Sequence, residues 1–172
     1  MKRITRIAMA AVLVCVCSWM TVPFTVPFTM QTFAVFCALQ LLGWKDGTAA
    51  VALYLLLGAA GLPVFSGFGA GVGHLLGPTG GYMLGFLLMG AVYAPFEHLI
   101  EKDRRWVWPA LALGLLACYL AGTLRFVQVM GAKGSSFTFL SALGVCVFPY
   151  VLPDLAKMAL SVFVCRRVKK AL

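Results

Sequence analysis

Asp154 and Lys157 are the residues whose types and spacing best suit ligand chemistry in this chain. They lie three positions apart in a long apolar segment near the C-terminus, so one helix would carry both on the same face. A charged side chain inside a membrane costs at least about 2.5–3.5 kcal/mol, and such residues usually have a function. We predict a polar clamp in which Asp154 accepts hydrogen bonds from ligand N–H groups and Lys157 donates to a carbonyl or a carboxylate. The alternative is an ion pair that only caps the helix, since the helix dipole favours a negative group in the first turn.

A glycine-rich segment over residues 63–81 is the second feature that could act on a ligand. Its glycines predict either a flexible connector or a mobile lid over a pocket that opens to the outside. The spacing differs from the G-x-G-x-x-G dinucleotide fingerprint, and the sequence contains no G-x-x-x-x-G-K-[ST] phosphate loop. The chain therefore has no P-loop of its own with which to hydrolyse ATP.

The residues that usually support metal or catalytic chemistry are poorly arranged for either. The six cysteines lie in apolar runs, without the paired spacing of a zinc site or a disulfide framework, and behave as small buried hydrophobes. His74 and His98 stand alone, and the serines have no neighbouring histidine and acid. We predict no metal site, no cofactor and no enzymatic activity.

The composition predicts the elements that must position Asp154 and Lys157. Hydrophobic residues make up 62% of the 172 residues and charged residues 11%, against about 45–50% and about 25% in soluble domains. One membrane crossing needs about 20 apolar residues, and uncharged runs cover residues 7–44, 47–96, 106–124 and 134–153. We predict an all-α integral membrane protein with one domain over residues 1–172. Its six transmembrane helices are expected at about 4–20, 30–42, 48–62, 82–100, 106–125 and 153–168.

Three connecting segments have patterns of their own. Prolines and β-branched residues over 21–29 favour an extended backbone. Residues 43–47 are expected to form a tight polar turn and residues 126–137 a loop. Residues 137–152 are expected to form a short re-entrant or surface helix, which is tolerated at membrane depth only when protein or a water-filled cavity shields it.

Lysine and arginine placement predicts the orientation. With the N-terminus inside, eleven of these residues fall on the inner side, and only Arg125 and Lys133 fall on the outer side. This bias places both termini in the cytoplasm. The net charge of +9 is thereby explained by topology in the lipid bilayer of the cell membrane, without a nucleic-acid partner.

Small residues form a stripe on the first helix at Ala8, Ala11 and Cys15. Such a stripe is typical of close helix packing within a bundle. It would equally suit a docking groove for another membrane subunit, and both interpretations stay open.

Four sequence blocks together resemble the BioY family. The blocks are Val26-Pro27-Phe28-Thr29-Met30-Gln31-Thr32-Phe33, Tyr54-Leu55-Leu56-Leu57-Gly58-Ala59-Ala60-Gly61-Leu62-Pro63-Val64-Phe65, Gly77-Pro78-Thr79-Gly80-Gly81-Tyr82-Met83-Leu84-Gly85-Phe86, and Pro149 followed by Pro153-Asp154-Leu155-Ala156-Lys157. They occur in the family's order and cover nearly the whole chain.

The resemblance implies a function and partners. BioY proteins are the biotin-binding S components of energy-coupling factor (ECF) transporters, with six membrane helices and both termini inside. The resemblance implies that biotin binds near the outer side. It also implies three partner subunits, namely a membrane coupling subunit and two cytoplasmic ATPases. Carried over by position, Asp154 and Lys157 match the family's ligand-binding pair, Tyr82 the aromatic polar residue of the Gly-Gly-Tyr block, and Gln31 the Gln-Thr block.

Two positions depart from the family pattern. The helix-1 motif Ala-x-x-x-Ala, which S components use to dock onto the coupling subunit, is replaced here by Ala11 and Cys15 as the nearest small pair. Arg125 stands where an apolar or aromatic residue is expected. It either attracts the anionic vitamin at the outer mouth or extends to water along its apolar stem.

Three function classes follow from these features. The first is a substrate-capture subunit that binds biotin with high affinity and delivers it inward when ATP-driven partners reorient it. The second is a self-sufficient secondary carrier or facilitator for a small carboxylated vitamin, driven by an ion gradient. The third is a membrane enzyme that uses Asp154 as an acid or a base. The resemblance to the BioY family favours the first.

Overall fold

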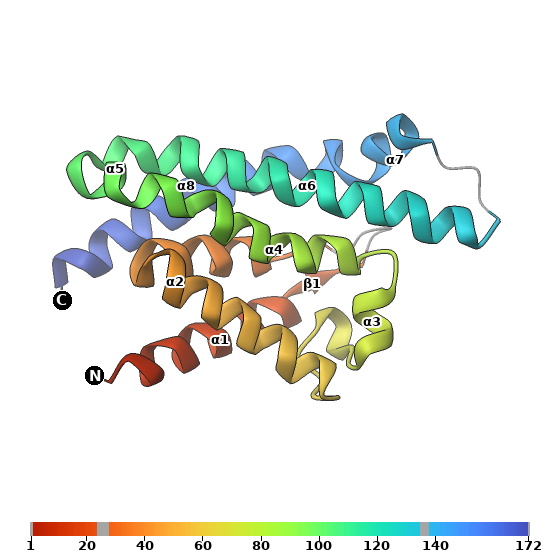
Figure 1. Ribbon diagram of the computed structural model, residues 1–172, viewed down its shortest axis with the longest axis horizontal. Helices are drawn as coiled ribbons and strands as arrows, with labels where there is room; N and C mark the ends of the chain where they lie inside the picture. The colour runs from red at the N-terminus through yellow and green to blue at the C-terminus, as the bar shows by residue number, and fades with distance from the viewer. Residues whose placement is uncertain (1, 24–27, 135–137, 172) are drawn as a thin grey trace.

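A computed structural model describes residues 2–23, 28–134 and 138–171, and these form a helical bundle (Figure 1). The main helices are α1 (Arg3–Trp19), α2 (Gln31–Ala59), α4 (Gly80–Tyr93), α6 (Val107–Ala132) and α8 (Phe148–Ala171). The shorter helices are α3 (Val72–Leu76), α5 (Glu97–Lys102) and α7 (Phe139–Cys146), and three 3-10 turns cover Ser66–Phe68, Ala94–Phe96 and Arg104–Trp106. By length and apolar composition, three stretches within the described residues could cross a membrane: Gly80–Lys102, Arg104–Ala132 and Phe148–Ala171.

Helix α2 covers both helices that the sequence placed at 30–42 and 48–62. The break lies at Gly43 alone, whose φ of 84° and ψ of 175° leave the helical region, a conformation that glycine adopts readily. The helix resumes at Trp44, whose backbone N–H donates to the Glu97 carboxylate at 3.0 Å. The expected five-residue turn over 43–47 is therefore wrong, because Glu97 satisfies the orphan donor that the break creates.

The ends of three other helices differ from the sequence expectation. The expected helix at 82–100 consists of α4, a 3-10 turn that contains Pro95, and α5. The expected loop over 126–137 is wrong as far as Ala132, because α6 continues through the buried Phe126. Helix α8 begins at Phe148 and carries Pro153 inside it. The rule that proline marks a first turn therefore placed this start five residues too late.

The connecting segments are only partly as expected. Within 21–29, Thr21–Val22 (β1) and Phe28–Thr29 (β2) are extended as the prolines indicate, and they pair as an antiparallel ladder that the sequence analysis did not predict. Residues 24–27 lie outside the described residues, as does residue 137 at the start of the expected surface helix. Helix α7 provides the short helix of that segment.

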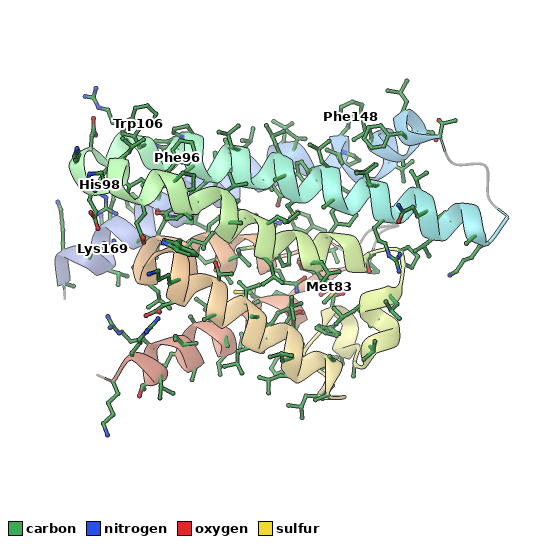
Figure 2. All side chains as sticks on the ribbon, in the orientation of Figure 1. Met83, Phe96, His98, Trp106, Phe148 and Lys169 are labelled. Atoms are coloured by element: carbon green, nitrogen blue, oxygen red, sulfur yellow. The ribbon has the colours of Figure 1, made fainter. Side chains whose placement is uncertain are left out.

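The long helices lie along the long axis of the bundle, so the molecule has two distinct ends (Figure 1). The start of α1 and the end of α8 lie at the end that carries α5, and α3 and α7 lie toward the opposite end. Lys169, His98 and Trp106 mark the terminal end in Figure 2. Helices α4 and α6 pack at close range because glycines face larger neighbours. A Cβ at Gly85 would lie 2.8 Å from the Cys118 sulfur.

Candidate functional site

A cavity lies where α2, α4, α6, α7 and α8 meet β2 and the glycine-rich segment. Its empty volume is about 620 Å³, which includes open solvent at its mouth. The lining residues are Thr29, Gln31, Thr32, Ser66, Thr79, Tyr82, Met83, Phe86, Cys118, Tyr119, Cys146, Tyr150, Asp154 and Lys157. All four residues proposed from the sequence as ligand contacts, Asp154, Lys157, Tyr82 and Gln31, therefore border one cavity.

The Asp154 carboxylate is the polar centre of this cavity. It is 4% exposed and accepts three hydrogen bonds. The Tyr119 hydroxyl donates to Oδ2 at 2.6 Å, while the Thr32 hydroxyl and the Lys157 ammonium each donate to Oδ1 at 2.9 Å. Charge-assisted bonds of this kind are about twice as strong as neutral ones, so the carboxylate is fixed in place by α2, α6 and its own helix.

The Lys157 ammonium is held equally closely. It donates to the Asp154 carboxylate and, at 2.6 Å, to the backbone carbonyl of Thr29 in β2. It also lies 3.9 Å from the centre of the Phe28 ring, a cation–π contact that strengthens when water is excluded. The sequence analysis also allowed an ion pair that only caps the helix. That interpretation does not account for these contacts, because residues of β2, α2 and α6 also bind the two charged groups.

Gln31 borders the cavity, and described groups occupy both ends of its amide. Its Nε2 donates to the Tyr54 hydroxyl at 2.5 Å, and its Oε1 accepts from the Thr29 hydroxyl at 3.0 Å. The Tyr54 hydroxyl in turn lies 3.4 Å from the Ser18 hydroxyl in α1. Gln31 thus belongs to a buried network that joins the two halves of α2 with α1 and β2.

Tyr82 forms part of the cavity wall that α4 contributes. Its hydroxyl lies 3.2 Å from the Thr123 hydroxyl in α6, and its ring sits against Gly122, where a Cβ would come within 2.1 Å of the ring. Together with Phe86 and Met83 from the same helix, Tyr82 presents a mostly apolar surface to the cavity. Figure 2 labels Met83 near the end of α4 that lies beside α3.

The glycine-rich segment contributes Ser66 and Thr79 to the lining of the cavity. Arg125 holds this segment from α6, since its guanidinium donates to the Leu76 carbonyl at the end of α3 at 3.1 Å. The Arg125 stem covers Gly81, where a Cβ would lie 2.3 Å from the Arg125 Cβ. This contact gives Arg125 a structural role beside the two functions that the sequence suggested.

The small-residue stripe on α1 is divided between the bundle and its surface. Ala11 and Cys15 are buried, and Ala8 is exposed. Their burial supports the interpretation as packing within the bundle for the two deeper residues. Docking of a partner on this stripe remains a prediction, for which Ala8 is the accessible member.

Thr32 and Tyr119 are the two hydrogen-bond donors to Asp154 that the sequence analysis did not assign to the candidate site. Both donate to Asp154, from α2 and α6. Thr32 directly follows Gln31 in a block already singled out, so its position was a usable signal. Tyr119 lies in an apolar run with no charged neighbour, and only the packing of α6 against α8 brings it to the carboxylate. Within the described part of the chain, no three His, Cys, Asp or Glu residues come together as a metal site.

Comparison with known proteins gives one consistent result. A model of the BioY family matches residues 1–172. "Biotin transporter BioY" of Thermotoga maritima is 37% identical over 174 residues, which covers 99% of this chain and 97% of that protein. "Probable biotin transporter BioY" of Pyrococcus horikoshii is 35% identical over 144 residues, which covers 84% of this chain and 81% of that protein.

A solved structure has the same fold. It is the S-component for biotin from an ECF-type ABC transporter, with a TM-score of 0.85 and 25% sequence identity. The match covers 98% of this chain and 90% of that chain. The fold observed here is therefore that of an S-component.

Proposed function

This chain belongs to the BioY family, a family of transporters rather than enzymes, and from that premise we propose that it is the biotin-capturing membrane subunit of a vitamin uptake system. The observation that carries the proposal is the buried Asp154–Lys157 pair on the wall of the cavity. Biotin is the transported ligand and serves no cofactor role. Similarity to the named biotin transporters of Thermotoga maritima and Pyrococcus horikoshii supports the choice of ligand.

The paired charges suit the ureido ring of biotin better than its carboxylate. A ureido ring offers two N–H donors and one carbonyl, which complement a carboxylate acceptor and an ammonium donor side by side. The pair is neutral as a whole, so a neutral ring adds no net charge to a site from which water is excluded. A second carboxylate beside Asp154 would repel it strongly at low dielectric.

With the ureido ring at the Asp154–Lys157 pair, the rest of the biotin molecule has a defined place in the cavity. Tyr82, Phe86 and Met83 provide the apolar wall for the bicyclic ring and the tail. In this proposal the biotin carboxylate lies toward Ser66 and Thr79, where the glycine-rich segment borders the cavity. This segment closes over the bound vitamin, and the Arg125 contact with Leu76 anchors it to α6.

The sequence contains no phosphate loop with which the chain itself could hydrolyse ATP, so uptake coupled to ATP would use partner subunits. The S-component whose fold this chain shares comes from an ECF-type ABC transporter. We propose that a membrane coupling subunit and two cytoplasmic ATPases reorient the loaded bundle, and that Ala8 on the exposed face of α1 contributes to the docking surface.

The proposed placement is a multi-pass protein of the cell membrane with both termini in the cytoplasm. The basic side chains support this orientation: Arg3 lies at the start of α1, Lys102 at the end of α5, and Lys169 near the end of α8. The start of α1, the end of α5 and the end of α8 lie together at one end of the bundle (Figure 1). We propose six spans, namely α1, the two halves of α2 on either side of Gly43, α4 with α5, α6, and α8. Within the described residues, the last three of these have the length and apolar composition of a membrane crossing.

Reconstitution of the purified chain alone into proteoliposomes tests the proposal against its rivals. We expect labelled biotin to bind at about one molecule per chain and to stay unaccumulated under an imposed proton or sodium gradient. Accumulation driven by a gradient would favour a secondary carrier, and recovery of a chemically altered ligand would favour an enzyme.

A further inference from the structure

Tyr54 lies at a junction between the cavity wall and the glycine-rich segment. It is fully buried in the second half of α2 and is not among the described residues that line the cavity. Its hydroxyl and its ring nevertheless contact two different parts of the site. A residue in this position can act on the ligand only through its neighbours.

The hydroxyl of Tyr54 connects to Lys157 through three steps. It accepts from Gln31 Nε2 at 2.5 Å, and Gln31 Oε1 accepts from the Thr29 hydroxyl at 3.0 Å. The Thr29 hydroxyl also accepts from the Gln31 backbone N–H at 3.3 Å, which fixes the turn from β2 into α2. The carbonyl of the same Thr29 accepts from the Lys157 ammonium at 2.6 Å. That carbonyl therefore helps to fix the ammonium, together with the Asp154 carboxylate and the Phe28 ring.

The ring of Tyr54 is fixed by the glycine-rich segment. Phe65 packs edge-on against it, with centroids 5.5 Å apart and planes at 79°. Phe65 itself stacks on His74 in α3 at 5.3 Å, and it fits closely over Gly58, where a Cβ would lie within 2.0 Å of its ring. Such packing leaves the Tyr54 hydroxyl one direction in which to point.

We propose that Tyr54 is a positioning residue that holds the Lys157 ammonium in its ligand-binding place through Gln31 and the Thr29 carbonyl. The proposal rests on the proposed function insofar as biotin is the ligand. It changes the role expected for Gln31, which acts chiefly by holding Thr29, because both ends of its amide are engaged within the protein.

Removal of the hydroxyl has a defined consequence. In Tyr54→Phe the ring keeps its contact with Phe65, the buried Gln31 Nε2 loses its acceptor, and Ser18 in α1 loses its 3.4 Å contact with the hydroxyl. A buried donor without a partner is costly, so the amide turns away and releases the Thr29 hydroxyl. Without that acceptor the Thr29 hydroxyl no longer stays aligned with the Gln31 backbone N–H, so the turn loosens and the Thr29 carbonyl holds the ammonium less closely.

The experiment compares Tyr54→Phe, Gln31→Met and the double variant with Tyr93→Phe as the control. Tyr93 is equally a buried tyrosine, lies in α4 and is outside the described lining of the cavity. Two quantities are measured in detergent: the dissociation constant for biotin, and hydrogen–deuterium exchange of the backbone amides of residues 28–33 without ligand.

We expect Tyr54→Phe to weaken biotin binding about fivefold, as loss of one buried hydrogen bond would, and Tyr93→Phe to leave it unchanged. The double variant should bind no more weakly than Gln31→Met, because both changes break one chain of contacts. Affinity of Tyr54→Phe within twofold of wild type, or independent effects that multiply in the double variant, would overturn the proposal.

The exchange measurement separates this proposal from the proposed function. Failure of the wild-type chain to bind biotin would refute the choice of ligand. The positioning role is then decided by the amides of residues 28–33. Faster exchange in Tyr54→Phe than in Tyr93→Phe supports it, and equal rates refute it.

Discussion

Replacement of Asp154 by asparagine perturbs the cavity at the point where most of its polar contacts converge. The carboxylate accepts from Tyr119 on one oxygen and from Thr32 and Lys157 on the other. Asparagine keeps nearly the same shape but has one acceptor oxygen and an amide that donates. At least one of the three donors therefore faces another donor, and the Lys157 ammonium loses its counter-charge.

The contacts set the size of the effect. Hydrogen bonds to a charged group contribute about 1.5–3 kcal/mol each, and loss of one partner from a buried ion pair costs about 3–5 kcal/mol. Part of this cost falls on the stability of the free protein. We expect the affinity for biotin to fall at least tenfold, which corresponds to about 1.4 kcal/mol.

The assay is equilibrium binding of labelled biotin to purified wild type, Asp154→Asn and Asp46→Asn. Asp46 provides a matched control, because it pairs with Arg3 in α1 and lies outside the described cavity lining. Asp46→Asn should bind biotin like wild type. An Asp154→Asn variant that folds and binds with unchanged affinity would refute the assignment of Asp154 to the site.

Three further predictions test the surrounding structure. Gly122→Ala should abolish most biotin binding and lower the unfolding midpoint, because the new Cβ would displace the Tyr82 ring. Gly131→Ala on the same helix should change neither quantity, since its Cβ would meet no described atom within 4 Å. Burial of the His74 imidazole lowers its pKa below the ordinary value of about 6.5. The stability that the neutral ring contributes should therefore be lost as the pH falls from about 6.5 through the lower pKa of the folded state. Thermal unfolding at pH 7 and pH 5 should show a larger loss in wild type than in His74→Phe, and equal losses would exclude this cause. Ala8→Leu should leave biotin binding intact and reduce uptake in cells that contain the partner subunits, whereas normal uptake would remove Ala8 from the docking surface.

Much of the helical framework was predictable because an apolar chain in a bilayer has few alternatives. Uncharged runs of sequence show where the helices lie, and lysine and arginine residues mark the ends of these runs. The errors came from interactions that a local pattern does not contain. Gly43 breaks α2 at a single residue because Glu97, more than fifty positions away, accepts from the next backbone N–H. Similarly, α6 extends past its expected end through the buried Phe126.

The candidate site could be predicted where charge makes a residue conspicuous. Asp154 and Lys157 stand out in an apolar helix, and the cavity lies beside them. Tyr119 and Tyr54 were not assigned a role because buried tyrosines are ordinary in such a sequence. Their roles depend on which atoms they meet across the bundle, and only the packing of α6 and of the second half of α2 determines those contacts.

A calorimetric titration of the purified, detergent-solubilised chain with biotin tests the central claim most directly. The account predicts saturable binding at one site per chain, with biotin recovered unchanged afterwards. Absence of binding by wild-type protein that is demonstrably folded would contradict biotin capture in this cavity.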